Sequence, residues 1–257
     1  MAHDASEYVI ALAHTLAEIE AVHSLQEEIW GSPQIAVPTT LLRVFSEAGG
    51  VLLLAKANDR PIGFAFGFTG RTPEGVTYHR SHAAGVLPEF RNQGIGRALK
   101  QAQRQAVLAA GMDRIVWTFD PTQVRNAHFN LRRLGATARA FRADYYGQRV
   151  DALSHGLPTD RLIVEWFLGN AEQAELDRLR NRSNLISIRV PEGLPPKAGA
   201  DPAEMQRLQS VLRDELESAL RPGLQVIDFD AETRSYRLAE LPSSFPAPVE
   251  GGPPSTD

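Results

Sequence analysis

The sequence contains no cysteine among its 257 residues. This absence excludes disulfide bonds, thiolate metal sites and a cysteine nucleophile, so an acyl-thioenzyme intermediate cannot form. It is also compatible with a reducing compartment, and we expect a cytoplasmic location. No apolar run approaches the roughly 20 residues that a membrane span needs, and residues 1–20 lack the basic flank and apolar core of a signal peptide. We therefore expect no membrane association.

The sequence also lacks an excess of positive charge. Its 27 lysines and arginines are outnumbered by 31 aspartates and glutamates, for a net charge of −4, so we expect no nucleic-acid partner. The histidines show no ligand spacing and no His-Glu-x-x-His motif is present, so we predict no catalytic metal. The chain does contain 43% hydrophobic residues, enough for the core of one large domain or of a domain with a smaller second one.

One segment organises the chain. Residues 85–96 have the sequence Gly-Val-Leu-Pro-Glu-Phe-Arg-Asn-Gln-Gly-Ile-Gly. Residues 78–86 are strand formers, and Pro88 cannot continue a strand interior. Further on, apolar residues at three- and four-residue spacing predict a helix over residues 95–110, with one face made by Ile95, Leu99, Ala102, Ala106 and Ala110. The segment is therefore predicted to be the loop of a strand–loop–helix unit.

This loop is predicted to bind an anion. The first N–H groups of a helix lack intrahelical partners and carry the positive end of its dipole. Gly94 and Gly96 have no Cβ, so a phosphate can approach the backbone closely, and Arg91 and Arg97 add cationic donors. We expect a pyrophosphate at this position.

The sequence pattern narrows the choice of ligand. No Gly-Lys-Ser/Thr is present, which excludes a Walker loop, and no third glycine completes a dinucleotide-binding fingerprint. Arg-x-x-Gly-x-Gly after a strand that ends in Val-x-Pro resembles motif A of the GNAT superfamily of CoA-dependent N-acyltransferases. The resemblance implies acetyl-CoA or another acyl-CoA as co-substrate, with its pantetheine arm inserted where the strand before the loop splays from the next strand. By the same resemblance, the cofactor-binding residues are Val86, Arg91, Asn92, Gln93, Gly94, Ile95, Gly96, Arg97 and Asn126.

Asn126 has a second interpretation. We expect it to open the helix that follows the apolar strand 114–119, where an asparagine in this family often touches the CoA arm. An N-cap asparagine would occupy the same position for structural reasons alone, and the two roles are compatible.

The order of the predicted elements supports the resemblance over about residues 5–168. We expect strands at 7–13, 51–57, 61–68, 78–86, 114–119 and 160–168, the last at the far side of the sheet, and helices at 16–29, 39–48, 95–110 and 126–134. This is an α/β fold with a GNAT-type mixed central sheet flanked by helices. In many such enzymes the first two helices form one wall of the acceptor site.

A C-terminal α+β extension is predicted to follow. Its elements are a helix at 171–182, a strand at 185–190, a helix at 202–220 and a hairpin of strands 224–229 and 235–241. The extension either lengthens the sheet or packs as a small second domain. We expect domains at 1–170 and 171–241 and a disordered proline-rich tail at 242–257.

An amine acceptor needs a general base, because it is mostly protonated at pH 7. The resemblance places His82 and Ser81 on the strand that borders the acyl group, and the pKa of a histidine suits the task. His82 can equally be a hydrogen-bonded strand histidine. His79 is a weaker candidate, and Glu27 and Glu28 on the first helix are further options.

The usual general acid of the family is missing from this chain. Many members have a tyrosine three residues before the Leu-Gly that closes the last helix, whereas this chain has Leu131 before Leu134 and Gly135. Transfer does not require that acid, because a thiol with a pKa near ~8.5 gives a tolerable leaving group. Tyr145 could replace it, and the alternative is that Tyr145 and Tyr146 form a structural pair.

Residues 125–149 hold six arginines against a single acid, Asp144. Three interpretations stay open: attraction for the 3′-phosphate of CoA, recognition of a carboxylate on the acyl group or acceptor, and a solvated face with internal ion pairs. The carboxylate interpretation predicts that Arg139 or Arg142 recognises an acidic substrate. The six are Arg125, Arg132, Arg133, Arg139, Arg142 and Arg149.

We predict an acyl-CoA-dependent N-acyltransferase, most simply an N-acetyltransferase, that acts on the amine of a small molecule by direct attack in a ternary complex. One alternative is N-succinyl or other acyl transfer to an amino acid. Another is a catalytically weak CoA-binding regulatory module, which the missing tyrosine suggests. A nucleic-acid-linked role of the arginines and a protein or peptide acceptor are further alternatives. The oligomeric state stays open, with a homodimer among the options.

Overall fold

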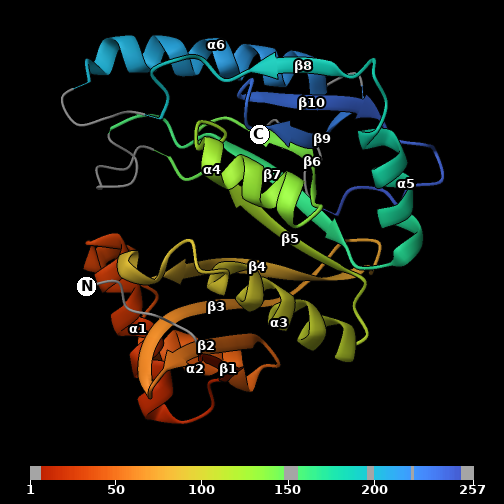
Figure 1. Cartoon of the computed structure of the whole chain (residues 1–257). Helices are drawn as coiled ribbons and strands as arrows, with labels where there is room; N and C mark the ends of the chain where they lie inside the picture. Colours follow the sequence, from red (N-terminus) through yellow and green to blue (C-terminus); the bar gives the residue numbers. More distant parts are fainter. Residues whose placement is uncertain (1–6, 148–155, 196–199, 221–222, 250–257) are drawn as a thin grey trace. The chain divides into compact units, whose positions relative to one another are not determined.

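The computed structural model of the chain describes residues 7–147, 156–195, 200–220 and 223–249 (Figure 1). The chain divides into two compact units, Met1–Ile115 and Val116–Asp257, which we call the N-terminal and the C-terminal unit. The division falls inside a strand and does not coincide with the domain boundary expected at residue 170. That functional boundary stays a prediction.

In the described part of the N-terminal unit, four antiparallel strands pair in the order β1-β2-β3-β4. In Figure 1 this unit runs from red to olive. The strands are β1 (Val9–Leu12), β2 (Val51–Ala57), β3 (Arg60–Arg71) and β4 (Thr77–Val86), and the helices are α1 (Leu16–Trp30), α2 (Thr39–Glu47) and α3 (Ile95–Ala109), with 3₁₀ turns η1 (Pro33–Ile35) and η2 (Pro88–Phe90).

Local sequence signals set the ends of these elements. Thr15 caps α1 through a capping box with Glu18, and Gly31 ends the helix in the left-handed conformation. Asn58 and Asp59 both have positive φ, the geometry that a two-residue hairpin turn requires, and they join β2 to β3.

Different helices cover the two faces of this sheet. Phe64, Phe66 and Phe68 alternate along β3 on the face that α1 and α2 cover through Trp30 and Phe45. The residues between these phenylalanines are glycine and alanine, and they lie on the face of α3. The small side chains let α3 pack close to the sheet, which places its N-terminus beside the end of β4.

The C-terminal unit combines strands and helices from the rest of the chain. Its described strands pair in the order β5-β7-β6-β9-β10-β8. They are β5 (Arg114–Phe119, whose first two residues belong to the N-terminal unit), β6 (Thr137–Arg142), β7 (Arg161–Phe167), β8 (Ile186–Arg189), β9 (Leu224–Asp230) and β10 (Ser235–Glu240), with helices α4 (Val124–Ala127), η3 (His128–Arg133, a π-helix), α5 (Asn170–Arg180) and α6 (Pro202–Leu220).

Two sequence expectations fail in this unit. β7 lies between β5 and β6, so its expected place at the far side of the sheet is wrong. β6 was not expected as a strand, because two alanines and two arginines give Thr137–Arg142 little intrinsic strand preference. The pairing of Ala138 with Val226 joins β9 to β6, so the C-terminal extension lengthens the sheet of this unit.

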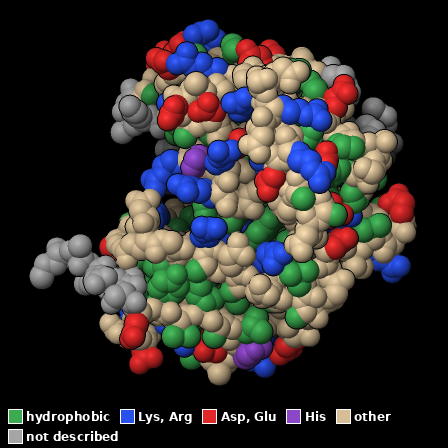
Figure 2. Space-filling view, turned by 45° about the vertical axis from the view of Figure 1, so that its right-hand side comes forward, with side chains coloured by type: hydrophobic (Ala, Val, Ile, Leu, Met, Phe, Trp, Pro, Cys, Tyr) green, Lys and Arg blue, Asp and Glu red, His purple; other side chains and the backbone are tan. Residues whose placement is uncertain are grey.

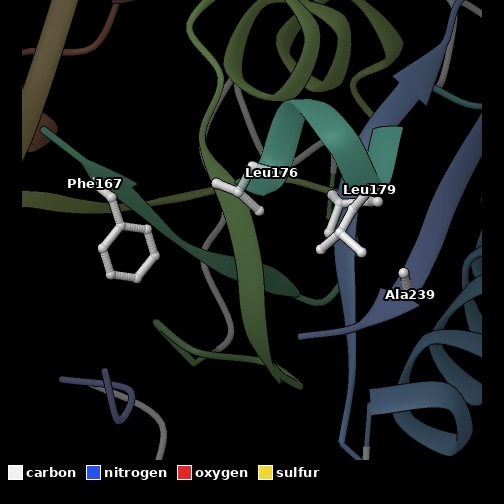
Figure 3. Packing of buried hydrophobic residues seen from close by; sticks show 5 residues of the cluster. Phe167, Leu176, Leu179 and Ala239 are labelled. Atoms are coloured by element: carbon white, nitrogen blue, oxygen red, sulfur yellow. The ribbon is translucent and has the colours of Figure 1, made fainter. Parts of the chain in front are cut away.

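A hydrophobic cluster holds α5 against the sheet of the C-terminal unit. Figure 3 shows Leu176 and Leu179 of α5 directed toward the strands. The cluster consists of Phe167, Leu176, Leu179, Ile227 and Ala239, and Leu185, Leu241 and Phe245 pack around it.

Residues 242–249, which follow β10, make tertiary contacts. The ring of Phe245 meets that of Phe167 edge-to-face at 5.5 Å. The Val249 N–H donates to Glu165 Oε1 over 2.9 Å, and Arg139 donates to the carbonyl of Pro246. The expectation of disorder is therefore wrong for residues 242–249, where the segment makes tertiary contacts that proline content alone does not reveal. Residues 250–257 lie outside the described part.

Candidate functional site

The loop between β4 and α3 has the geometry of an anion-binding site. β4 ends at Val86, the η2 turn follows, and α3 begins at Ile95. Asn92 and Gly94 have positive φ values of 65° and 84°, and Gly94 is the N-cap of α3. Left-handed residues that alternate with ordinary ones turn successive N–H groups toward a common point, as in phosphate-binding nests.

Backbone donors collect at the start of α3. The first hydrogen bond of this helix runs from Ala98 N to Gly94 O over 3.0 Å. The N–H groups of Ile95, Gly96 and Arg97 precede this pattern, and they carry the positive end of the helix dipole. Such a terminus stabilises a phosphate through both hydrogen bonds and charge.

Open space lies over the same donors. Within the described chain, a Cβ at Gly94 would meet no heavy atom within 4 Å. A Cβ at Gly96 would meet only Val86 Cγ2, at 4.0 Å. In the described part of the chain, the two glycines therefore leave room beside the backbone, as a phosphate-binding loop requires.

Two polar side chains of the predicted binding set have structural partners in this loop. Arg91 Nε donates to the carbonyl of Val86 over 3.0 Å, so Arg91 ties the loop to the end of β4. Gln93 Nε2 donates to the carbonyl of Glu89 over 3.1 Å. Arg91, Gln93 and Arg97 are all exposed, so they surround the N-terminus of α3 with polar and cationic groups.

A β-bulge separates the two candidate bases on β4. Phe66 pairs with Ala83 and Gly67 pairs with Ser81, so His82 is the extra residue in the strand. The His82 ring is exposed and lies 5.2 Å from the ring of Phe66, on the face of α1 and α2. Ser81 is buried on the opposite face, against α3.

The pKa of His82 is lowered from its ordinary value. Partial removal of the ring from water is the larger cause, and the charge of Arg80 is the smaller one. A neutral imidazole at pH 7 can accept a proton, so the bulge presents His82 in the form that a general base needs.

Sequence reasoning missed a buried polar network on the α3 face. Lys100 Nζ donates to Ser81 Oγ over 2.9 Å and to Gln103 Oε1 over 3.0 Å. Gln103 Nε2 lies 3.1 Å from His79 Nε2, and all four side chains are buried. Burial lowers the pKa of Lys100 to about 7. Burial, followed by the Lys100 charge, lowers the pKa of His79 to about 3.

This network encloses two of the predicted residues. Ser81 and His79 are buried on the α3 side, whereas His82 is exposed on the other face. A sequence signal for the network did exist. Gln103 follows Ile95 and Leu99 at the same four-residue spacing, and all three are buried. The alanines predicted on this face, Ala102, Ala106 and Ala110, are half-buried or exposed.

The helix after β5 differs from its expected form. It begins at Val124 with Gln123 as N-cap, so the N-cap interpretation of Asn126 is wrong, and Asn126 is an exposed residue inside α4. α4 continues into a π-helix, a form that is frequent at functional sites. Leu131, in place of the family tyrosine, is fully buried.

Tyr145 and Tyr146 form the pair that the structural interpretation describes. Their rings meet edge-to-face at 4.7 Å, and the Tyr146 hydroxyl lies 3.3 Å from Thr118 Oγ1. Arg161 stacks over the Tyr146 ring at 5.2 Å. Tyr145 is still 39% exposed, so its role as a general acid stays a prediction.

The arginines of residues 125–149 have several internal partners. Arg139 lies 3.6 Å from the fully buried Glu165, and Arg132 donates to Asp228 over 2.9 Å. Arg142 donates to the carbonyl of Phe141 over 3.0 Å. These contacts favour the ion-pair interpretation over carboxylate recognition by Arg139 or Arg142. Arg149 lies outside the described residues.

No group of three or more His, Cys, Asp or Glu side chains in the described part could hold a metal ion. None of the helices described here has both the length and the apolar character for crossing a membrane.

Comparison with known proteins gives a family match and a shared fold. The sequence model of the acetyltransferase (GNAT) family matches residues 19–136, whereas no curated protein sequence matches the chain. The fold is similar to that of ribosomal-protein-S18-alanine N-acetyltransferase from Escherichia coli, with a TM-score of 0.51, 15% sequence identity, and coverage of 63% of this chain and 95% of that chain.

Other solved structures are also similar in fold to this chain. yncA from Salmonella typhimurium, whose structure holds its cofactor acetyl-CoA, matches with a TM-score of 0.51 and 18% identity over 64% of this chain and 95% of its own. A GNAT-family acetyltransferase from Streptococcus pneumoniae matches with a TM-score of 0.51 and 13% identity over 63% and 100%. The matched family region contains the β4–α3 loop. Residues 19–136 therefore match the GNAT family model, and the fold is that of GNAT acetyltransferases.

Proposed function

We propose that this enzyme transfers an acetyl group from acetyl-CoA to the amine of a small molecule by direct attack. The geometry at the start of α3 carries the proposal. The N–H groups of Ile95, Gly96 and Arg97 would bind the pyrophosphate of CoA, and Gly94 and Gly96 leave the space for it. The other members of the proposed cofactor site are Val86, Arg91, Asn92, Gln93 and Asn126.

The chemistry follows from the residues that the chain has and lacks. The amine nitrogen attacks the thioester carbonyl carbon, the carbon–sulfur bond breaks, and CoA leaves as a thiolate while the new amide loses a proton. The absence of cysteine leaves direct attack as the simplest route. The buried Leu131 supplies no acid, but a thiolate of pKa near ~8.5 leaves without one. Tyr145 is the proposed acid if one is used.

His82 is the proposed general base. Its ring is exposed beside the bulge of β4, and its lowered pKa keeps it neutral at pH 7. Ser81 accepts a hydrogen bond from Lys100 and is enclosed against α3. We therefore assign Ser81 to the support of β4.

One alternative retains structural support. A fully buried Leu131 in place of the family tyrosine favours a catalytically weak CoA-binding module. Succinyl transfer to an amino acid has less support, because Arg139 is engaged by Glu165 and by the Pro246 carbonyl.

Thermal denaturation with CoA, acetyl-CoA and succinyl-CoA tests the cofactor site. We expect all three to stabilise the wild-type protein and none to stabilise the double substitution Gly94→Val, Gly96→Val. Gly111→Val is the matched control, because Gly111 also has positive φ and open space but lies at the other end of α3. Equal stabilisation of wild type and double variant would contradict the site.

Turnover separates the enzyme from the binding module. Release of CoA thiol from acetyl-CoA in the presence of small primary amines is expected for the enzyme. Binding of CoA without thiol release across a broad amine panel would instead support the module.

A further inference from the structure

A band of aromatic rings crosses the face of the N-terminal sheet that carries α1 and α2. The ring of Phe45 stacks on that of Phe68 at 5.1 Å, and His82 lies 5.2 Å from Phe66 and 6.3 Å from Phe68. We define the aromatic band by its six rings, which are Trp30, Phe45, Phe64, Phe66, Phe68 and His82.

Part of the aromatic band lies on the protein surface. Phe64 and Phe66 are buried and belong to the core, but Phe45 and Phe68 are only half-buried and His82 is exposed. On α2, Leu41 and Val44 are 43% and 56% exposed, and Leu41 lies one turn before Phe45. The apolar surface therefore continues from His82 onto α2. Figure 2 shows hydrophobic side chains gathered on the surface of the N-terminal unit.

The strands under this surface carry no acidic side chain. β3 and β4 are fully described, and neither contains an aspartate or glutamate. An acceptor with two or more ammonium groups would find no carboxylate partner on these strands. Aromatic rings instead bind apolar and aromatic groups, and their faces attract a single ammonium.

Packing also fixes where the aromatic band lies relative to the cofactor loop. A Cβ at Gly85 would lie 2.9 Å from Ile29 Cδ1 of α1 and 3.1 Å from the Phe64 ring. The face of the band therefore reaches the residue before Val86, where the loop begins. Between Gly85 and His82 the strand has only Ala83 and Ala84, whose side chains are small.

From these contacts we infer that the acceptor is a primary amine attached to an aromatic or other apolar group, which packs on Phe45 and Phe68 with its nitrogen at His82. This inference rests on the proposed function, because it assigns the surface around His82 to the acceptor. The rings of Phe45 and Phe68 then determine specificity, whereas His82 is the group that takes the proton.

A comparison of matched amines tests the inference. Phenethylamine and ethylamine both present a primary amine, but only phenethylamine can cover the two rings. Putrescine represents a dicationic acceptor, and glycine represents an acceptor with a carboxylate. We expect the wild-type enzyme to prefer phenethylamine over each of the others by at least about tenfold in kcat/KM. Phe45→Leu and Phe68→Leu keep an apolar side chain but remove the ring, and each should reduce this preference about three- to tenfold.

Two controls separate specificity from folding. Phe245→Leu removes a half-buried ring in the C-terminal unit and should leave the preference unchanged. In the two band variants, stabilisation by acetyl-CoA should stay at its wild-type value, because the proposed cofactor site does not use the rings.

Each contrary outcome has a distinct meaning. A preference for putrescine or glycine, or an equal loss of turnover with all amines in Phe45→Leu and Phe68→Leu, would overturn the inference and leave the proposed acetyltransferase activity intact. Stabilisation by acetyl-CoA with no turnover of any amine would overturn the proposed function, and the inference with it.

Discussion

Lys100 Nζ donates a hydrogen bond to Ser81 Oγ over 2.9 Å, and both side chains are buried. Ser81 lies directly before the bulged His82 on β4, whereas Lys100 lies on α3, the helix whose N-terminus forms the proposed pyrophosphate site. One buried hydrogen bond thus joins the strand of the candidate base to the helix of the cofactor loop.

The buried lysine predicts a pH-dependent stability. The pKa of Lys100 is about 7 in the folded chain against an ordinary 10.5, so the unfolded chain binds more protons between these values. The stability that this group contributes is fully present above pH 10.5 and is lost as the pH falls toward 7, with a slope of at most about 1.4 kcal/mol per pH unit. We expect the unfolding free energy of Lys100→Met to lack this rise between pH 7 and pH 10.

Denaturant unfolding at a series of pH values checks this prediction. Lys100→Met also removes two hydrogen bonds, which costs about 1–3 kcal/mol at every pH, so the slope rather than the absolute value is the test. Identical pH dependence in wild type and variant would show that Lys100 does not lose its proton in this range.

A second prediction concerns Gly96. This glycine lies in the first turn of α3, where alanine would be more favourable by up to about 1 kcal/mol and would meet only Val86 Cγ2 at 4.0 Å. We expect Gly96→Ala to raise the melting temperature of the free protein and to weaken CoA binding several-fold, because its methyl group enters the space over the N–H donors.

The opposite signs of these two effects make the measurement specific. Gln105→Ala changes an exposed position on the same helix and should leave CoA binding at its wild-type value. Calorimetric titration with CoA gives the affinities. Unchanged affinity in Gly96→Ala would place the pyrophosphate elsewhere.

A third prediction concerns His82 and the pH dependence of turnover. General bases contribute about 10²–10⁴-fold to rate, so His82→Gln should lower kcat by at least about 100-fold without weakening CoA binding. Because its pKa is lowered, the wild-type rate should fall only at pH values below the ordinary 6.5 of a histidine, and this acid limb should disappear in the variant. His14→Gln, at an exposed position, is the control. A wild-type rate in His82→Gln would transfer the role to another group.

The sequence predicts much of the fold because several elements carry strong local signals. The helix Pro202–Leu220 has the predicted bounds, and the β4–α3 loop lies where its glycines and proline indicate. These features depend on the chain within a few residues of each position, which periodicity, caps and breakers describe well.

The parts that could not be predicted depend on tertiary contacts. Alanine is neutral between core and surface, so the prediction put three alanines on the buried face with Ile95 and Leu99, but those alanines are half-buried or exposed. The sequence does not predict a buried Lys100, because burial of a lysine is tolerated only where the fold supplies partners such as Ser81 and Gln103. Likewise, no local feature of the sequence predicts the hydrogen bond from the Val249 N–H to the buried Glu165.

The last prediction tests the segment that follows β10. Residues 242–249 cover Phe167 with the ring of Phe245 and donate a hydrogen bond to Glu165, whose carboxylate is fully buried beside Arg139. Removing the segment would expose the ring of Phe167 to water. It would also expose one side of the buried ion pair between Arg139 and Glu165. We expect truncation after Leu241 to destabilise the C-terminal unit by about 2–4 kcal/mol, which lowers the melting temperature by several degrees.

A shorter truncation provides the matched control, because removal of residues 250–257 keeps every contact named above. That variant should melt at the wild-type temperature, and Phe245→Ala in the full chain should reproduce part of the loss caused by the longer truncation. If both truncated variants had the melting temperature of the wild type, the contacts of residues 242–249 would contribute nothing to stability. If both were equally destabilised, the stabilising contacts would belong to residues 250–257 instead.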